Sequence, residues 1–519
     1  MRSPLARKLA LLIKRAHFLN QHPEISINEF CDQLQSRREF LKQTALIPAS
    51  LFIGGGAISS CASLPMPPTQ IESVPNVIIL GAGMAGLSCA YHLTKAKIKC
   101  SIYESSSRSG GRILTKENFN QEQMYCELGG ELIDSNNQDI INLCKELAIE
   151  IETFADYDRG LEPNLYYIKN KLYTDRELLP VFQKFAKHLK KAKAKPPETI
   201  DRLSLAEFLS KIVDVEPWLL EVMRVAYVGE SGVEADQQSA LMMVGTIYDD
   251  FSKAVRFFGD SDESLKIRGG NSKLISALEK YLTSNGVSIK YGTPIVGIKE
   301  NSLKIELLFK KDSGTESLQA DRVICTLPFT KLREIDGVFN LTLHPMKKTC
   351  IREMKYGTNS KMMLGFEKPI WRNLPKPHSN GMVYTDLFDQ NIWETSRLQK
   401  GSKGILTSFT GGREGENLSV GSIPEYLNSF EKIFPGLKKV FDSNSATFNW
   451  SKYVHSKGSY SVFGPGQMTQ FADFSSRPEL SNRLFFAGEH ATTEFAGFIN
   501  GAAYSGRLAA EKIKAQLQA

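Results

Sequence analysis

The chain has 519 residues, more than one hydrophobic core usually organises, so two domains are expected. Hydrophobic residues make up 42% and charged residues 23%, values near the globular average that exclude a mainly disordered or fibrous chain. The formal charge is +7, but the first sixty residues hold eight Lys or Arg against four acids and so account for +4 of it. The rest of the chain has no basic stripe of the kind that nucleic-acid binding needs, apart from a lysine-rich segment at 184–195.

Residues 1–61 are interpreted as an export leader. Arg37 and Arg38 are followed by Phe-Leu-Lys and by an apolar run from about 45 to 58, which is too short and too glycine-rich for a stable membrane anchor. This pattern resembles a twin-arginine signal, whose machinery transports folded proteins. Cys61 follows Ile-Ser-Ser as in a lipobox, so we expect its lipidation, with simple cleavage nearby as the alternative. The protein is then expected in the periplasm or anchored to a membrane as a lipoprotein, with 62–75 as a spacer.

The first buried strand is predicted at 76–80, because the run Asn-Val-Ile-Ile-Leu is continuous and rich in β-branched residues. A glycine motif follows at once, and a helix continues to about Thr94. The motif glycines allow a tight turn, close approach of a pyrophosphate and tight packing of the helix, so the cofactor is assigned to Gly81, Gly83, Met84, Ala85 and Gly86. A second strand ends in Glu104, 23 residues after Gly81, where a carboxylate can accept both ribose hydroxyls.

A second glycine-rich stretch separates FAD from NAD as the cofactor. The run from Arg108 to Arg112 and the later Glu127 to Glu131 are similar to the flavin monoamine oxidase family, within the FAD-dependent amine oxidase and L-amino acid oxidase superfamily. This resemblance implies that Arg108, Gly111 and Arg112 lie at the pyrophosphate, and that Gly129 and Gly130 pass beside the flavin ring. The family's usual Arg-x-Arg pair reads Ser106 at its first position, which removes one adenosine-side contact.

The C-terminal region resembles the other half of the same FAD site. An apolar strand at 483–487 precedes Gly488 and Glu489, and the resemblance assigns a ribityl hydroxyl to the Glu489 carboxylate. A helix that begins near Gly497 would direct its N-terminal N–H groups at the flavin, so Phe498 and Ile499 are also assigned to the cofactor. In the middle of the chain, Val296 is expected to hold the adenine through its backbone.

Two segments without dinucleotide signals, 151–255 and 335–450, interrupt the FAD-binding pieces 76–150, 256–334 and 451–519. We therefore expect an α/β fold: a Rossmann-like FAD-binding domain with an interleaved α+β substrate-binding domain over the flavin.

The resemblance also assigns catalytic residues on the substrate side. It places Lys361 beside a water near flavin N5, and it places Tyr460 and Phe498 as two facing walls of an aromatic cage. Ser459 stands where some family members carry a cysteine bonded to the flavin, so non-covalent FAD is expected. The eight cysteines are scattered without a CxxC pair, and they predict neither a metal site nor a disulfide framework.

The reaction that the resemblance implies is removal of a hydride equivalent from the carbon that bears a neutral amine. Water hydrolyses the resulting imine to an aldehyde and ammonia or an amine, and the reduced flavin is reoxidised by O2 with release of H2O2, or by an electron carrier. No Ser/His/Asp nucleophile is required. A desaturase of the same superfamily and a non-catalytic FAD-binding protein are alternatives that Lys361 and the aromatic pair disfavour.

Amino acids are the main competing substrates. L-Amino acid oxidases, dehydrogenases and tryptophan 2-monooxygenase-like enzymes need a cation for the substrate carboxylate, and several place an arginine just after the flavin loop. This chain has Glu131, Leu132 and Ile133 in that neighbourhood, which favours amines. The amino acid alternative stays open because another cation could bind the carboxylate, with candidates at Arg352, Arg397 and Arg413.

Overall fold

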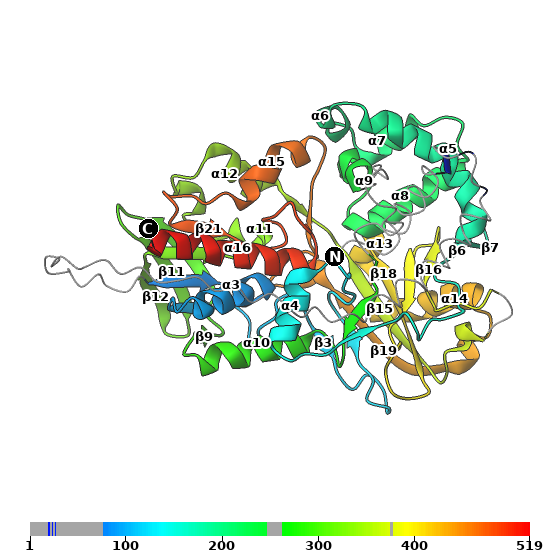
Figure 1. Ribbon diagram of the computed structural model, residues 1–519, viewed down its shortest axis with the longest axis horizontal. Helices are drawn as coiled ribbons and strands as arrows, with labels where there is room; N and C mark the ends of the chain where they lie inside the picture. The colour runs from blue at the N-terminus through cyan, green and yellow to red at the C-terminus, as the bar shows by residue number, and fades with distance from the viewer. Residues whose placement is uncertain are drawn as a thin grey trace, which may run out of the picture.

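The computed structural model describes residues 19, 20, 23, 26, 76–246, 262–373 and 377–518. The twin-arginine pair, Cys61 and the spacer 62–75 lie outside these described residues. The described chain crosses between two halves several times, so that each half is built from segments far apart in sequence (Figure 1). We call them the cofactor half and the substrate half.

A parallel sheet of five strands lies at the centre of the cofactor half, counted over the described residues. Its order is β21 (Leu484–Phe486), β13 (Arg322–Cys325), β1 (Val77–Leu80), β2 (Cys100–Tyr103) and β9 (Ser288–Lys290). The central strand β1 is buried on both faces, as its unbroken apolar sequence predicts. This parallel arrangement confirms the expected Rossmann-like α/β organisation.

Helices cover one face of this sheet (Figure 1): α3 (Met84–Lys95), α4 (Gln138–Glu146), α10 (Ser272–Ser284) and α16 (Ile499–Gln518). The first and last of them touch closely. Ser88 Oγ donates to the carbonyl of Ala503 at 2.7 Å, and a Cβ on Gly506 would overlap the backbone carbonyl of Ala85. At Ala85 and Gly506 the backbones of α3 and α16 are therefore in direct contact, with no side chain between them.

The opposite face of the parallel sheet packs against a mixed layer with its own apolar cluster. This layer contains the antiparallel strands β10 (Ile295–Glu300), β11 (Ile305–Lys311) and β12 (Gly314–Ala320), with the helices α11 (Phe329–Leu332), α12 (Pro345–Glu353) and α15 (Gln467–Ser476). The sequence division at 335 assigns α12 to the substrate domain. In the structure Cys350 and Ile351 of α12 belong to the apolar cluster of the cofactor half, together with Ile78 and Val323.

A second sheet forms the floor of the substrate half. Its order is β19 (Phe441–Asn449), β15 (Ser360–Phe366), β18 (Gly404–Thr410), β17 (Asn391–Glu394), β16 (Val383–Thr385), β6 (Leu165–Ile168) and β7 (Lys171–Thr174). All neighbouring pairs are antiparallel except the parallel pair of β16 and β6. Helix α14 (Ile423–Ile433) packs on this sheet, while α13 (Gly412–Asn417) lies at the end of β18.

Helices complete the substrate half at the upper right of Figure 1: α5 (Asp175–Lys193), α6 (Pro197–Asp201), α7 (Leu205–Ser210), α8 (Pro217–Ser231) and α9 (Ala240–Thr246). The long helix α5 begins at a capping box of Thr174 and Glu177 and buries Phe182 and Phe185. Two described residues near the N-terminus contact this bundle: Leu19 is buried in its apolar cluster, and the Asn20 amide donates to the carbonyl of Gln183 at 2.8 Å.

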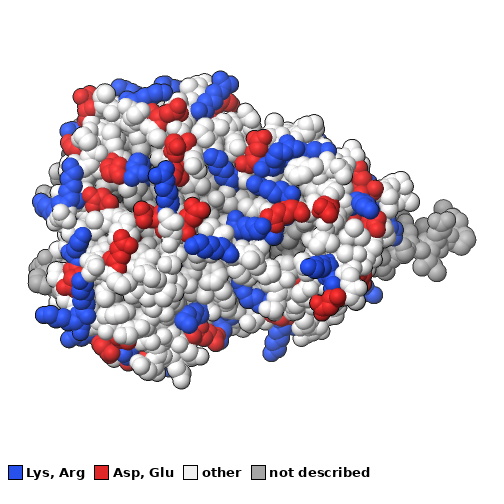
Figure 2. Space-filling model, turned by 180° about the vertical axis from the view of Figure 1, so that it is seen from behind, with Lys and Arg blue, Asp and Glu red and all other residues white. Residues whose placement is uncertain are grey.

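Short strand pairs connect the remaining pieces: β3 (Thr115–Lys116) with β4 (Cys126–Glu127), β5 (Ile151–Thr153) with β8 (Leu265–Ile267), and β14 (Lys355–Tyr356) with β20 (Ser461–Val462). The face seen in Figure 2 carries basic and acidic side chains interspersed over its surface. Within the described ranges, no helix is both long and apolar enough to cross a membrane.

Candidate active site

A cavity that is partly open to solvent lies between the two halves, and its empty space, the open part included, is about 1130 Å³. Both ends of the chain and its middle contribute to the lining. Of the residues assigned from sequence, the lining includes Gly81, Gly83, Met84, Ala85, Glu104, Gly111, Arg112, Gly129, Gly130, Lys361, Tyr460, Gly488, Glu489, Phe498 and Ile499. Gly86, Arg108 and Val296 are not part of it. Segments separated by up to about 400 residues thus meet around one space.

The loop from Gly81 to Gly86 leads β1 into α3 at the cavity. A Cβ on Gly86 would overlap the Gly81 carbonyl oxygen, so Gly86 serves helix packing, as its place in the motif predicts. A Cβ on Gly83 would meet no protein atom within 4 Å and would project into open space. The loop therefore leaves room for a ligand against its backbone, at the N-terminus of α3.

Glu104 ends β2 with its carboxylate held in place by backbone donors. One carboxylate oxygen accepts from Ala82 N–H at 2.8 Å, and the other accepts from Ser106 N–H at 2.7 Å. The neighbouring Ser105 hydroxyl lies 2.9 Å from His455 Nδ1, so His455 closes over this end of the cavity. The His455 contact was not predicted, because the two residues are 350 positions apart.

Arg108 braces its own loop. Its guanidinium donates to the carbonyls of Ser109 and Ile113, each at 3.0 Å, and to the carbonyl of Gly111 at 2.6 Å. It supports the glycine loop without lining the cavity. The Val296 carbonyl accepts from Asp336 N–H at 3.0 Å, and the adenine contact of Val296 stays a prediction.

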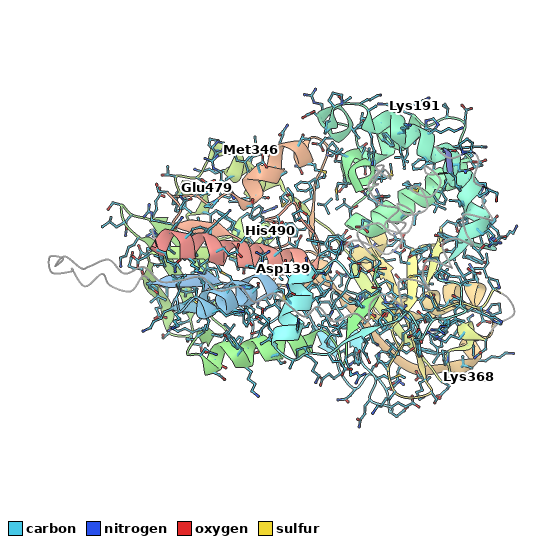
Figure 3. The ribbon with its side chains drawn as sticks, in the orientation of Figure 1. Asp139, Lys191, Met346, Lys368, Glu479 and His490 are labelled. Carbon is cyan, nitrogen blue, oxygen red and sulfur yellow. The ribbon has the colours of Figure 1, made fainter. Side chains whose placement is uncertain are left out.

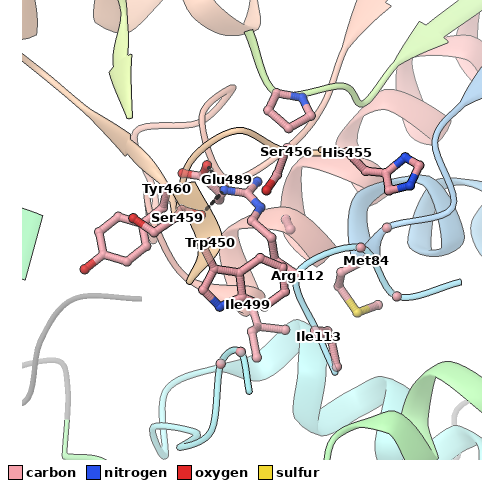
Figure 4. A pocket seen from close by; sticks show the side chains of 18 of the residues that line it. Met84, Arg112, Ile113, Trp450, His455, Ser456, Ser459, Tyr460, Glu489 and Ile499 are labelled. Carbon is pink, nitrogen blue, oxygen red and sulfur yellow. Dashed lines mark hydrogen bonds and ion pairs between the residues drawn. The ribbon is translucent and has the colours of Figure 1, made fainter. Parts of the chain in front are cut away.

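Arg112 and Glu489 form an ion pair across the cavity wall at 2.8 Å (Figure 4). Ser461 adds its hydroxyl to the same carboxylate at 2.8 Å. Burial raises the pKa of Glu489, but the charges and hydrogen bonds around the carboxylate, with the Arg112 guanidinium first among them, together outweigh burial, and the pKa lies below its usual value. The N-terminal residues of α16, Ile499 and Ala502, line the cavity next to this pair.

His490 follows Glu489 and is almost fully buried. Its ring packs against Phe329 and Tyr356, and neither ring nitrogen has a hydrogen-bond partner among the described residues. Burial lowers the pKa of His490 to about 4, so the imidazole is neutral at physiological pH. It is a structural support for the Glu489 loop.

Lys361 is the second residue of β15, and its side chain is 1% exposed. The ammonium donates to Glu131 Oε2 at 2.9 Å and to the Glu127 carbonyl at 3.0 Å, and it lies 5.0 Å from the Trp393 ring. The ion pair with Glu131 was not predicted. No local sequence signal could have revealed it, since β15 and the Glu131 loop are 230 residues apart.

Aromatic side chains line the substrate end of the cavity: Phe409, Trp450, Tyr460 and Phe498. The Tyr460 hydroxyl donates to the Glu230 carbonyl, and Trp450 Nε1–H donates to the Leu128 carbonyl at 2.9 Å. The Ser459 hydroxyl donates to Asn359 Oδ1 at 2.6 Å. The first two bonds hold the rings of Tyr460 and Trp450, which are labelled in Figure 4, in defined positions.

The three arginines that were candidates for a substrate carboxylate lie elsewhere. Arg397 donates to Asp158 at 3.1 Å and stacks on Phe154, while Arg352 stacks on the Phe339 ring. Arg413 is exposed on α13. None of the three lines the cavity.

The residues present fit an FAD. Gly83 leaves a side-chain volume open at a helix N-terminus, where a diphosphate gains from the backbone N–H groups. Glu104 is preset at the end of β2 for a ribose, and a second helix N-terminus, that of α16, borders the cavity toward Lys361. Within the described ranges, no group of three or more His, Cys, Asp or Glu side chains could hold a metal ion.

A family comparison agrees with this geometry. Residues 84–514 match the family described as flavin containing amine oxidoreductase. The chain belongs to this family. It is therefore an FAD-dependent oxidoreductase of the amine oxidase family, and this membership confirms the resemblance inferred from the glycine motifs.

Two relatives that are similar in sequence are named as L-amino-acid oxidases. The chain is 26% identical to a protein named putative L-amino-acid oxidase YobN of Bacillus subtilis, over 83% of this chain and 93% of the relative. It is 24% identical to an L-amino-acid oxidase of the snake Sistrurus catenatus edwardsii, over 86% and 88%.

Solved structures share the fold. A putrescine oxidase with bound putrescine has a TM-score of 0.70 at 19% identity, over 85% of this chain and 99% of that one. A cyclohexylamine oxidase of Brevibacterium oxydans has a TM-score of 0.73 at 17% identity, over 86% and 100%.

Proposed function

We propose that this protein oxidises a primary amine with an apolar substituent to an imine. A hydride, that is one proton with two electrons, leaves the amine carbon, and one proton leaves the nitrogen. The bound FAD would be the electron acceptor. O2 takes up the two electrons and two protons as H2O2, and water converts the imine to an aldehyde and ammonia. The residues of this chain bind the amine, orient it and exclude water from the reacting carbon.

One observation carries the choice of an amine: each cation that lines the cavity is already paired. Among the described residues these cations are Lys361, which is bound to Glu131, and Arg112, which is bound to Glu489. His455 also lines the cavity, but at the ribose end. A substrate carboxylate placed beside them would be buried without a partner, which costs several kcal/mol. An amine enters as the neutral base and needs no counter-ion.

The aromatic wall supports an apolar substituent. Tyr460 and Phe498 lie on the lining with Phe409, and the polar atom of Tyr460 is directed to the Glu230 carbonyl. The substrate therefore meets ring carbons at this end of the cavity. Flat rings on both sides of an amine restrict its orientation, which favours transfer from one carbon.

The test uses substrate pairs that differ only by a carboxylate. Phenylethylamine and L-phenylalanine form one pair, and putrescine and L-ornithine form another. Each is mixed anaerobically with the enzyme while flavin absorbance is followed. We expect phenylethylamine to reduce the flavin at least about a hundredfold faster than L-phenylalanine, a difference of about 2.7 kcal/mol. Faster reduction by both amino acids would overturn the proposal.

L-Amino acid oxidation is the second candidate, because the curated relatives described above are named L-amino-acid oxidases and match more than four-fifths of the chain. Under this candidate a cation must reach the substrate carboxylate. The three arginines considered for this role, Arg352, Arg397 and Arg413, do not line the cavity. The matched substrate pairs therefore decide directly between the two functions.

We propose that the FAD is held without a covalent bond, since Ser459 offers a hydroxyl already donated to Asn359. Purified protein should be yellow, and acid precipitation should release the flavin into the supernatant. Flavin that stays with the pellet would contradict this proposal.

We also propose export by the twin-arginine route and lipidation of Cys61. The Arg37-Arg38 pair before Phe-Leu-Lys and a short apolar run supports the first proposal, and Ile-Ser-Ser before Cys61 supports the second. Replacing Arg37 and Arg38 together by Lys should retain the protein in the cytoplasm, and Cys61→Ala should abolish lipid labelling. Export of the double-lysine variant at the normal level would defeat the first proposal, and labelling of Cys61→Ala the second.

A further inference from the structure

The buried ion pair of Lys361 and Glu131 connects two parts of the molecule. Glu131 ends the loop 127–131, here called the flavin loop, and Lys361 lies on β15 of the seven-stranded sheet, here called the substrate sheet. Lys361 Nζ is 2.9 Å from Glu131 Oε2, and their side chains are 1% and 8% exposed. Lys361 lines the cavity, whereas Glu131 stands behind it. The carboxylate thus contacts the lysine from the side away from the substrate.

Glu131 is itself fixed by the substrate sheet. Thr395 donates its hydroxyl to Glu131 Oε1 at 2.8 Å and shares a second hydrogen bond with Thr407 at 2.6 Å. Burial alone raises the pKa of Glu131, but the Lys361 ammonium and the hydrogen bonds hold it below its usual value. Glu131 is therefore ionised, and it offsets the lysine charge at contact distance.

The charge of Lys361 matters because of what the flavin does. Reduction adds negative charge to the flavin, and a nearby cation stabilises that charge in a dry site. An ammonium in contact with a carboxylate presents a dipole to the cavity in place of a full charge. The second carboxyl of this loop, Glu127, has its pKa raised to about 7 by burial, so near neutral pH it carries less negative charge than Glu131.

We propose that Glu131 is a positioning residue that aims Lys361 at the cavity and weakens its charge there, and so restrains the electron affinity and the O2 reactivity of the bound flavin. This inference rests on the proposed function, because it assigns Lys361 to the flavin side of the same site. The O2 step is unchanged in its balance: two electrons and two protons pass from reduced flavin to O2, giving H2O2.

The decisive variant is Glu131→Gln, which retains an oxygen acceptor for Lys361 and removes the negative charge. Sulfite is the probe, because it binds oxidised flavin as an anion and reports the local charge without any amine. We expect sulfite to bind about tenfold tighter, equivalent to about 1.4 kcal/mol, the flavin midpoint potential to become more positive, and reoxidation by O2 to accelerate.

The coupling to Lys361 separates this role from a merely structural one. Lys361→Met should weaken sulfite binding, and Glu131→Gln in that background should change it by less than about twofold. The matched control is Glu394→Gln, which removes another buried, ion-paired carboxylate of the same sheet, bound to Arg372 at 2.7 Å and off the cavity. It should leave sulfite affinity and potential unaltered.

Several results would overturn the inference: unchanged or weaker sulfite binding in Glu131→Gln, or an equal gain in the Lys361→Met background. If Glu131→Gln does not retain flavin, Glu131→Asp replaces it, because the shorter side chain draws the carboxylate away from Lys361. Tighter sulfite binding than in the parent then supports the inference, and unchanged or weaker binding opposes it. Sulfite and potential are measured without substrate, so failure of the amine panel leaves this test intact.

Discussion

The two ends of the cavity are built in different ways. At the cofactor end much of the lining comes from glycine backbones and helix N-termini within short stretches of chain, such as Gly81 to Gly86 at the start of α3. At the substrate end they come from side chains of distant segments, such as Lys361 on β15 and Glu131 on the flavin loop. Backbone recognition should be intolerant of added atoms, whereas side-chain recognition should respond to charge and ring shape. Four predictions test this contrast, from the largest expected effect to the smallest.

The largest effect is expected for Gly86→Ala. The added methyl would overlap the Gly81 carbonyl, where neither backbone can move without separating β1 from α3. We expect loss of folded flavoprotein, since overpacking of this kind costs about 3 kcal/mol or more. Soluble yield and thermal unfolding measure it.

Gly83→Ala is the matched control, because its methyl meets no protein atom within 4 Å. It should fold with parental stability as apoprotein and bind FAD about a hundredfold more weakly, a loss of about 2.7 kcal/mol. Equal flavin content in the Gly83 variant and the parent would contradict the assignment of this backbone to the diphosphate.

The second prediction concerns His490 and pH. Its pKa is about 4 in the folded protein, against 6.5 for an exposed histidine, so the unfolded state binds an additional proton between these values. Stability should therefore fall as pH falls from 6.5 to 4, by about 3 kcal/mol from this residue. His490→Phe should remove this component.

Two buried acids act in the opposite direction over an overlapping range. Burial raises the pKa values of Glu127 and Asp389 to about 7, so each contributes stability that is present at low pH and lost as pH rises toward 7. The measurement is therefore the difference between His490→Phe and the parent in denaturant unfolding at pH 4.5, 5.5 and 6.5. A difference that does not vary with pH would show that His490 is not titrating as assigned.

The third prediction concerns Tyr460 at the substrate end. Tyr460→Ala removes a ring from the cavity wall and should lower kcat/KM for the best amine about thirtyfold, close to 2 kcal/mol. Tyr460→Phe keeps the ring and loses only the bond to the Glu230 carbonyl. It should stay within about threefold of the parent. A large loss in Tyr460→Phe would assign the hydroxyl, not the ring, to the reaction.

The smallest effect is expected for Lys361→Met, which retains similar length without the charge. Reoxidation of the flavin by O2 should slow about tenfold, or about 1.4 kcal/mol, while reduction by the amine changes less. Stopped-flow measurement of both half-reactions separates the steps. If neither rate changes, Lys361 has no part in the chemistry. The expectation that the substrate end responds to the charge of its side chains would then be wrong for this residue.

The same contrast explains how far sequence reasoning could go. The β1 strand, the glycine loop and Glu104 lie in one βαβ unit, where spacing alone specifies the geometry, and the structure brings them to the cavity. Arg108 shows where prediction from spacing ends even in this unit, because its guanidinium donates to carbonyls of its own loop and does not line the cavity. A motif identifies the segment, but the direction of a long side chain depends on nearby acceptors.

At the substrate end the family resemblance located Lys361 and Tyr460, and the partners of both came only from the fold. The carboxylate of Glu131 and the carbonyl of Glu230 are each 230 residues from the side chain they bind. The packing of α12 on the cofactor half is a similar case, since its apolar residues carry no signal of which sheet they face. Such pairings follow from tertiary packing and leave no periodic trace in sequence.

The close contact of α3 with α16 has a consequence for the order of events during synthesis. Ala85 and Gly506 meet backbone to backbone, although the ribosome makes them more than 400 residues apart. The nascent chain can form its first β-α-β unit early, yet the far wall of the FAD cavity emerges more than 400 residues later. Capture of the cofactor therefore waits until the residues near 500 have been made, and truncation before them should yield protein that never turns yellow.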